Sequence, residues 1–292
     1  MSQPSLWNDP TKTGPHTPPM NPLPPTNGTG THHQKKIVST ASGRLTRHTS
    51  MEPRSDSIYD QLIDGLKVFF DKRGITRAVI GMSGNVNSAL VLKIAIDALG
   101  AQNITALIMP ETGVTKPEYI DHAKVLCSYL EVEMYIQTIN PFITDFMLLP
   151  WKLNSEALAN AKARIRSMLL YSYANTDQAL VLGTSNKSDL LLGYGMQYSG
   201  PTCDIQVIGA LLKTEVVALA DTIGLPPEIT GEDDDALELG APYADVDKVL
   251  RNIELGANGC IEKGLPPFLV HKVFRIYEAR KHKTKIGPIL KI

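Results

Sequence analysis

Short apolar runs alternate with longer amphipathic segments along the chain from about residue 57 to its end. Five of the runs have the length of a strand and end at small or polar residues. These predicted strands are residues 78–80, 104–109, 133–137, 179–182 and 205–209. Strands that alternate with helices form βαβ units with right-handed crossovers. The pattern therefore predicts an α/β fold, a doubly wound, Rossmann-like parallel sheet flanked by helices.

The segments between the predicted strands have the period of helices. Apolar residues recur in them every three or four positions, and several segments close on glycine or proline. The predicted helices are residues 57–74, 89–99, 117–130, 155–174, 213–223, 245–255 and 267–280. Ligands of open parallel sheets bind outside the carboxyl ends of the strands. We therefore expect a ligand site formed by the loops 81–88, 109–112 and 183–189.

The first 54 residues follow neither period. Eight prolines fall within residues 1–25 and interrupt any helix, and apolar residues are too sparse to offset the entropy of ordering. Residues 1–54 are therefore predicted to be a disordered, Pro-rich tail, and residues 55–292 to form one domain.

Composition narrows the class of protein. The 292 residues include 29 basic and 30 acidic side chains, a net charge of −1, so no global field favours nucleic acid. The three cysteines are scattered without metal-ligand spacing, which suits free thiols in a reducing compartment. No apolar run approaches the ~20 residues of a membrane span, and the first residues lack the apolar core of a secretory signal. We expect a cytoplasmic protein without a nucleic-acid or membrane partner.

The loop 81–88, Gly-Met-Ser-Gly-Asn-Val-Asn-Ser, follows the first predicted strand and leads into a helix. A tight loop of small polar residues before a helix N-terminus presents backbone N–H groups to a phosphate. The simpler alternative is an ordinary turn between a strand and a helix, which also needs small residues. We favour phosphate binding because later segments fit the same interpretation.

The loop 183–189, Gly-Thr-Ser-Asn-Lys-Ser-Asp, follows the fourth predicted strand. Its hydroxyls, ammonium and carboxylate suit a triphosphate with Mg²⁺. The simpler alternative is a helix cap, with Asn186 or Ser188 as the N-cap and Asp189 in the first turn. Because both loops are expected at the same edge of the sheet, we interpret this loop as the partner of loop 81–88 in one nucleotide site.

Basic residues elsewhere admit two interpretations. In the predicted helix before the fourth strand, Lys162 and Arg166 share a face and Arg164 points elsewhere. An arginine there can clamp a carboxylate or pyrophosphate, and Lys213, which opens a helix after a strand, can meet a phosphate. The simpler alternative for each is an exposed, solvated charge. The acidic run 232–235 lacks the spacing of a calcium loop and is interpreted as a mobile loop.

The order of these motifs resembles that of the ammonia-dependent NAD synthetases, within the adenine nucleotide alpha-hydrolase-like superfamily. The resemblance covers most of residues 57–286. Residues 83–88 stand where the family has Ser-Gly-Gly-x-Asp-Ser, and residues 160–166 resemble its Asn-x-x-Ala-Arg-x-Arg helix. Residues 182–189 are similar to its Leu-Gly-Thr-x-Asn-Lys-Ser-Glu loop. Shorter motifs follow in the family's order at residues 213–215, 238–240 and 282–283.

The resemblance implies a reaction. ATP adenylylates the nicotinate carboxylate of deamido-NAD and releases pyrophosphate, and ammonia then displaces AMP to give NAD. The resemblance also implies a homodimer, with ATP and Mg²⁺ as cofactors and the small-molecule substrate near the interface.

The resemblance further implies roles for residues at matching positions. Lys213 and Asp189 are the catalytic candidates, and Asp189 and Asn87 would hold Mg²⁺. The candidates for ATP binding are Ser83, Gly84, Asn85, Asn87, Ser88 and Thr184. The candidates for substrate binding are Arg164, Tyr198, Asp204, His282 and Lys283.

The sequence departs from the family's pattern at several places. Asn85 replaces a glycine and adds a side chain where the backbone approaches phosphate. Asn87 replaces an aspartate, which leaves a neutral ligand and weakens Mg²⁺ binding. Within residues 195–204, Gln197 and Gly200 stand in place of a lysine and an aspartate. Two alternatives therefore accompany NAD synthesis: a related ligase that amidates another carboxylic acid, and a nucleotide-binding protein with impaired catalysis.

Overall fold

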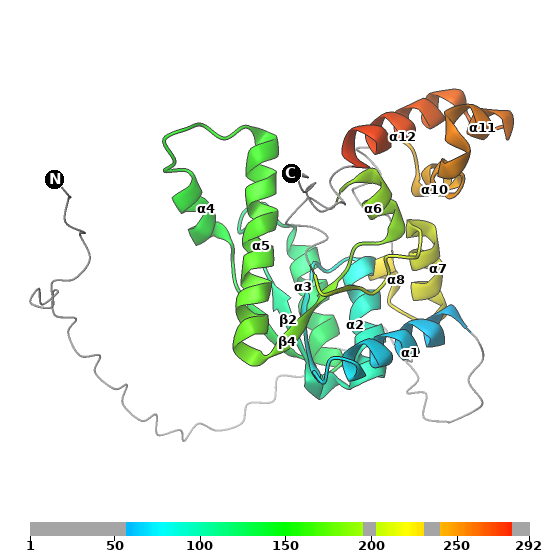
Figure 1. The fold of residues 1–292 in the computed structure, drawn as a ribbon. Helices are drawn as coiled ribbons and strands as arrows, with labels where there is room; N and C mark the ends of the chain where they lie inside the picture. Colours follow the sequence, from blue (N-terminus) through cyan, green and yellow to red (C-terminus); the bar gives the residue numbers. More distant parts are fainter. Residues whose placement is uncertain (1–56, 195–202, 231–239, 282–292) are drawn as a thin grey trace, which may run out of the picture. The chain divides into compact units, whose positions relative to one another are not determined.

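A five-stranded parallel sheet forms the centre of the computed structural model, which describes residues 57–194, 203–230 and 240–281 (Figure 1). The strands are β1 (Arg77–Gly81), β2 (Ile104–Ile108), β3 (Glu133–Ile136), β4 (Ala179–Gly183) and β5 (Ile205–Gln206). Their order in the sheet is β3-β2-β1-β4-β5. The chain moves outward from β1 to β3 and then returns to β4, so the winding reverses between the neighbours β1 and β4. The predicted α/β fold is confirmed.

Strand β1 occupies the middle of the sheet and is buried on both faces. Ile80 is aligned with Ala106 of β2 and with Leu182 of β4. Ile80 belongs to the core cluster on one face, and Val79 belongs to the cluster on the other face. Burial on both faces explains why the strand is a continuous apolar run and not an alternating one.

Helices cover both faces of the sheet. Five contribute to the core cluster on the face of Ile80: α1 (Ile58–Asp71), α2 (Val86–Leu99), α3 (Pro117–Tyr129), α7 (Lys213–Thr222) and the short α8 (Pro227–Thr230). Two contribute to the cluster on the face of Val79: α4 (Asn140–Phe146) and α5 (Ser155–Asp177). Figure 1 shows α5 on one side of the sheet and α1 and α2 on the other.

A second, smaller core joins the segment after β4 to the last helices of the described chain. Its buried residues include Leu192, Leu212, Val246 and Val270. They and their neighbours lie in or beside α6 (Lys187–Leu192), α10 (Tyr243–Arg251), α11 (Gly256–Glu262) and α12 (Pro267–Arg280). The other short elements of the described residues are the 3-10 turns η1 (Ala101–Asn103) and η2 (Ile253–Leu255).

Two boundaries near the predicted loops differ from expectation. Helix α2 begins at Val86 and not at residue 89, because Asn85 already has the extended backbone of an N-cap. The predicted fifth strand, residues 205–209, is limited to its first two residues because a turn follows at residues 207–210. The first difference shortens the loop after β1 and brings the N-terminus of α2 closer to the strand.

The helices differ from prediction mainly in length and number. The predicted helix 245–255 begins earlier, at Tyr243 after Pro242, and ends at Arg251. Helix α5 continues to Asp177 and stops where Gln178 adopts a left-handed φ of 52°. The sequence pattern does not predict α4 or α11, because segments this short carry little periodicity.

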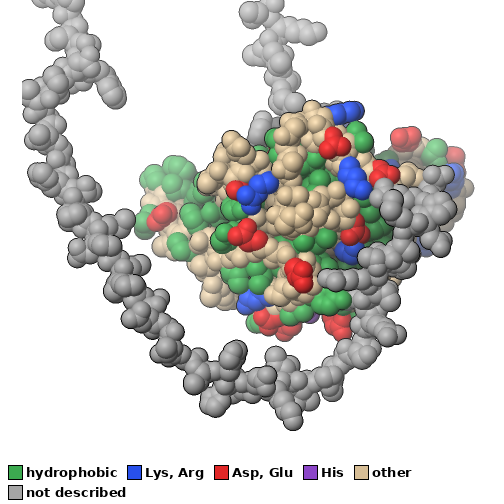
Figure 2. Space-filling model, turned by 90° about the horizontal axis from the view of Figure 1, so that it is seen from below, with side chains coloured by type: hydrophobic (Ala, Val, Ile, Leu, Met, Phe, Trp, Pro, Cys, Tyr) green, Lys and Arg blue, Asp and Glu red, His purple; other side chains and the backbone are tan. Residues whose placement is uncertain are grey.

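The surface of the described residues mixes charges of both signs. On the face drawn in Figure 2, Lys and Arg side chains are interspersed with Asp and Glu. Among the residues that the structure describes, no helix is long and apolar enough to cross a bilayer. The predicted tail, residues 1–54, and the acidic run 232–235 lie outside the described ranges.

Candidate functional site

The loop after β1 is held against helix α3 by a glycine. Gly84 has a φ of 87°, which side chains rarely tolerate. A Cβ at this position would lie 2.0 Å from the backbone oxygen of Tyr119. The loop and α3 can therefore pack this closely only with glycine at position 84.

Polar side chains fix the shape of this loop. Ser83 Oγ donates to Asn85 Oδ1 at 2.7 Å, and Ser88 Oγ donates to the backbone oxygen of Asn85 at 3.0 Å. The backbone N–H of Ser83 donates to Ser88 Oγ at 3.4 Å. Asn85 thus turns its side chain toward the exposed Ser83 and not onto the first turn of α2. The predicted phosphate loop is a structured turn at the N-terminus of a helix.

The loop after β4 caps helix α6. Asn186 Oδ1 accepts from the backbone N–H of Asp189 at 2.9 Å, and Asp189 Oδ2 accepts from the backbone N–H of Asn186 at 3.0 Å. This reciprocal pair is a capping box, as the simpler interpretation of the loop expects. Asn87 Nδ2 also donates to Asp189 Oδ2, at 3.1 Å. The two loops predicted to share a site are therefore in direct contact.

A buried lysine completes this contact. Lys213, the first residue of α7, is only 5% exposed. Its Nζ donates to Asn87 Oδ1 at 3.3 Å and lies 5.9 Å from the centre of the Tyr243 ring. Asn186 Nδ2 donates to the same Asn87 oxygen at 3.4 Å. Asn87 therefore lies between a carboxylate, Asp189, and an ammonium, Lys213.

A buried carboxylate behind the site is absent from the sequence-based candidates. Asp247 of α10 is 2% exposed and accepts from Ser188 Oγ at 2.6 Å and from the backbone N–H of Thr214 at 2.8 Å. The backbone N–H of Lys213 donates to Ser188 Oγ at 3.0 Å. A signal was available, because Asp247 interrupts the apolar stripe of its helix and a charge there needs partners.

A pocket of about 540 Å³ opens beside the two loops. Its polar wall includes Ser83, Asn85, Thr184 and Arg166, and its apolar wall includes Met109. Arg166 Nε donates to the backbone oxygen of Met109 at 3.0 Å. Burial lowers the pKa of the Arg166 guanidinium, yet an arginine remains charged at neutral pH. The pocket combines hydroxyls, a cation and an apolar surface, which suits a nucleotide.

The predicted substrate-binding residues are placed less closely together. Arg164 is exposed on α5, and its neighbour Arg166 lines the pocket. Lys162, on the same side as Arg166, pairs with Glu111 at 2.7 Å. Asp204 is exposed, and its Oδ2 accepts from the backbone N–H of the residue at position 181, at 2.7 Å. Tyr198, His282 and Lys283 lie outside the described residues.

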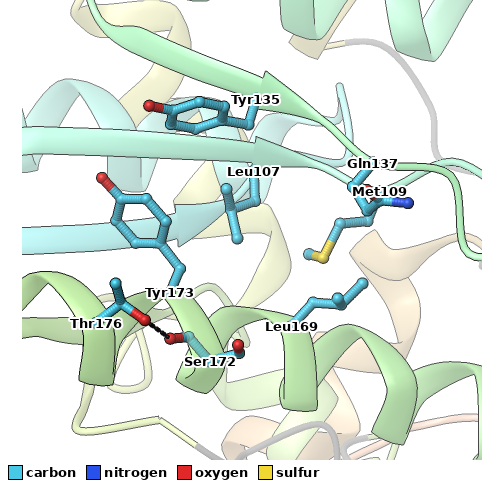
Figure 3. A pocket seen from close by; sticks show the side chains of 8 residues that line it. All are labelled: Leu107, Met109, Tyr135, Gln137, Leu169, Ser172, Tyr173 and Thr176. Carbon is cyan, nitrogen blue, oxygen red and sulfur yellow. Dashed lines mark hydrogen bonds between the residues drawn. The ribbon is translucent and has the colours of Figure 1, made fainter. Parts of the chain in front are cut away.

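A second hollow, of about 320 Å³, lies on the α5 face of the sheet. Figure 3 shows Leu107, Met109 and Leu169 around it, with Tyr135 and Tyr173 at one end. The two tyrosine rings lie 5.8 Å apart. None of its eight lining residues carries a charge. This hollow offers no cation to a phosphate, so the pocket beside the loops is the candidate nucleotide site.

The residues beside the loops do not match a protein-held divalent cation. In the described part of the chain, no three His, Cys, Asp or Glu side chains gather into a metal-binding group. Asn87 and Asp189 meet as expected of a metal-ligand pair, but the amide nitrogen of Asn87 faces the carboxylate and its oxygen faces donors. Magnesium prefers several oxygen ligands in octahedral geometry. This arrangement fits a hydrogen-bond network better than a magnesium site.

These features define a class of protein. Loops after two adjacent parallel strands line a pocket at the point where the winding of the sheet reverses, and a buried lysine contacts Asn87 at the start of the helix that follows the first loop. Nucleotides bind to open α/β sheets at this point. The chain therefore has the architecture of a nucleotide-binding α/β protein.

Comparison with known proteins identifies the family. The sequence matches the NAD synthase family over residues 58–287, and the chain belongs to this family. It is 34% identical over 249 residues to an NH(3)-dependent NAD(+) synthetase of Wolinella succinogenes, covering 81% of this chain and 96% of that protein. It is 35% identical over 246 residues to the enzyme of the same name in Methanosarcina acetivorans, covering 79% and 96%.

A solved structure agrees with this assignment. The NH3-dependent NAD synthetase of Campylobacter jejuni, in complex with the nitrate ion, has a TM-score of 0.71 and 31% sequence identity. The match covers 80% of this chain and 97% of that one. The predicted resemblance to NAD synthetases is confirmed at the level of both sequence and fold.

Proposed function

We propose that this protein is an ATP-dependent ligase that converts deamido-NAD and ammonia to NAD, with release of AMP and pyrophosphate. Membership of the NAD synthase family supports this proposal. The structural observation that supports this function is the contact of Asn87 with both Asp189 and Lys213. This contact joins the two predicted phosphate-binding loops, 81–88 and 183–189, to a buried ammonium. Such a site provides what the reaction needs, a fixed position for the phosphates of ATP.

The loops would bind ATP through their N–H groups and hydroxyls. With the Gly84 turn before it, the N-terminus of α2 would face the phosphates of the nucleotide, because backbone dipoles there favour negative charge. Ser83 and Thr184 would contact phosphate oxygens from the two loops, and both line the pocket. Arg166 adds a guanidinium at the pocket wall. Ser88 and Asn85 hold the first loop in shape.

The chemistry requires a carboxylate to become a good electrophile. The deamido-NAD carboxylate oxygen attacks the α-phosphorus of ATP, and the bond to pyrophosphate breaks. Ammonia then attacks the acyl carbon, loses a proton and displaces AMP. Lys213 would stabilise the charge that grows on the departing pyrophosphate, and Asp189 would hold Asn87 and the second loop in place. Magnesium would arrive bound to the phosphates of ATP.

Two exposed charges remain candidates for the second substrate. Arg164 and Asp204 are open to contact from outside the chain, and the partner subunit of a homodimer could cover them. Together with Tyr198, His282 and Lys283, they are the residues that we propose for deamido-NAD.

We further propose a homodimer formed through α4 and α5. Large apolar side chains are exposed in and around these helices: Phe146, Met147, Leu148, Trp151 and Met168. Exposed apolar patches of this kind mark sites of protein association. The three cysteines form no disulfide, which supports a reducing, cytoplasmic location.

One assay tests the reaction. Purified protein is incubated with ATP, Mg²⁺, ammonia and deamido-NAD, and NAD and AMP are both quantified. We expect equal amounts of NAD and AMP. AMP release only with another carboxylic acid would identify a different amidating ligase, and nucleotide binding without turnover would identify an impaired homologue.

A matched pair of variants tests the role of the buried cation. Lys213→Met removes the ammonium beside Asn87, and we expect the rate of NAD formation to fall about 100-fold or more. Lys248→Met removes an ammonium that is 62% exposed on α10, and the rate should stay within about twofold because exposed charges contribute little. Equal rates for the two variants, with folding confirmed by circular dichroism, would refute this role of Lys213.

A further inference from the structure

Asn87 can satisfy its neighbours in only one orientation. Its Nδ2 donates to Asp189 Oδ2 at 3.1 Å, and its Oδ1 accepts from Lys213 Nζ at 3.3 Å. A carboxylate can only accept and an ammonium can only donate, so rotating the amide by 180° would break both contacts. Asn186 Nδ2 donates to the same oxygen at 3.4 Å. The amide oxygen, the atom that a metal ion needs, therefore faces donors.

Asp189 has a structural function of its own. The oxygen that accepts from Asn87 also accepts from the backbone N–H of Asn186, as part of the cap of α6. The charges of Asp189 and Lys213 have opposite sign, and Asn87 between them is neutral. Within these three side chains, the charges cancel without an added metal ion.

We propose that Asn87, Asp189 and Lys213 form a metal-free anchor for the nucleotide, in which the Lys213 ammonium, and not a divalent ion held by the protein, supplies the positive charge. The inference rests on the proposed function insofar as ATP is the ligand. Magnesium then reaches the site only with the phosphates of ATP. Affinity for the nucleotide depends on Lys213 and only weakly on the metal.

An aspartate at position 87 would give these three side chains a net negative charge. Asn87→Asp places a second carboxylate at hydrogen-bond distance from Asp189, and two carboxylates this close favour either a proton or a cation between them. Asn85→Asp is the matched control. It adds the same charge to the same loop, but the side chain at position 85 contacts Ser83 and not a carboxylate.

The first experiment uses Mn²⁺ as a probe for divalent cations. Free Mn²⁺ is titrated by electron paramagnetic resonance against the full chain without nucleotide. We expect Asn87→Asp to bind one Mn²⁺ per chain at least about tenfold more tightly than the wild-type protein, and Asn85→Asp to stay within about threefold of wild type. Wild-type protein that binds Mn²⁺ as tightly as Asn87→Asp would overturn the proposal.

The second experiment needs no variant. Calorimetry measures the affinity of the wild-type protein for α,β-methylene-ATP in EDTA and in Mg²⁺. We expect the two affinities to differ by less than about fivefold, and a loss of more than about tenfold in EDTA would overturn the metal-free anchor. An analogue that binds under neither condition would refute the proposed function, whereas the Mn²⁺ titration would still decide whether position 87 excludes a cation.

Discussion

Ser188 Oγ donates a hydrogen bond of 2.6 Å to Oδ1 of Asp247, and both side chains are almost completely buried. The other carboxylate oxygen of Asp247 accepts from the backbone N–H of Thr214, and Ser188 Oγ accepts from the backbone N–H of Lys213. One carboxylate of α10 therefore holds the start of α7 and the start of α6 together. It positions the lysine that contacts Asn87.

Removal of this carboxylate should destabilise the fold. Asp247→Ala leaves a buried hydroxyl and a buried N–H without their charged acceptor, and we expect the free energy of unfolding in urea to fall by about 2–4 kcal/mol. Asp245→Ala is the control, because Asp245 lies on the same helix in an exposed pair with Lys248. That change should stay below about 0.5 kcal/mol. Similar losses for both variants would contradict the role of Asp247.

A comparison of variants at Gly84 and Gly113 distinguishes the cost of close packing from the cost of backbone strain. Both have a positive φ, 87° and 85°, but only a Cβ at Gly84 meets the backbone of Tyr119; the described surroundings of Gly113 are open. We expect Gly113→Ala to cost about 1 kcal/mol of strain and Gly84→Ala about 3–4 kcal/mol. Urea unfolding measures both. Equal losses would show that the contact with Tyr119 does not constrain the loop.

The fold was predictable because its information is local. Each strand of the sheet overlaps a predicted apolar run, and parallel strands necessarily end at one edge. That rule alone predicted the contact between loops 81–88 and 183–189, and the bond from Asn87 to Asp189 confirms it across 102 positions of sequence. Short helices such as α4 and α11 escaped prediction, because seven residues do not establish a period.

The site was predictable only in part, because side-chain direction depends on packing. The helical period correctly separated Arg164 from Arg166, but it did not show which of them faces the pocket. The sequence also did not reveal which way the amide of Asn87 turns, since that depends on Asp189 and Lys213 together. Both neighbours belong to segments that are distant in the sequence, so the pattern of residues around Asn87 does not predict these contacts.

Burial of a thiol predicts a loss of stability at high pH. Burial raises the pKa of Cys127 from its ordinary value near 9 to about 11. Above pH 9 the unfolded chain releases this proton and the folded chain retains it. The free energy of unfolding is therefore fully retained below pH 9 and falls between pH 9 and 11. At pH 10, titration of this thiol lowers the free energy of unfolding by about 1 kcal/mol.

Cys127→Ala tests this contribution. The variant loses some packing at every pH, so the comparison uses the slope and not the absolute value. We expect the free energy of unfolding of the wild-type protein to fall more steeply between pH 8 and 10 than that of Cys127→Ala, by about 1 kcal/mol over the interval. Parallel curves would mean that the thiol titrates alike in both states.

A charge placed on α4–α5 should disrupt the proposed dimer. Leu148 is 79% exposed between these helices, and Leu148→Glu would put a carboxylate where a partner subunit would bury an apolar side chain. We expect dimerisation to weaken at least about tenfold, measured by light scattering across a concentration series. Phe268→Glu is the control, because Phe268 is 80% exposed and belongs to α12, not to α4 or α5. A dimer that survives Leu148→Glu but is lost with Phe268→Glu would move the interface to α12.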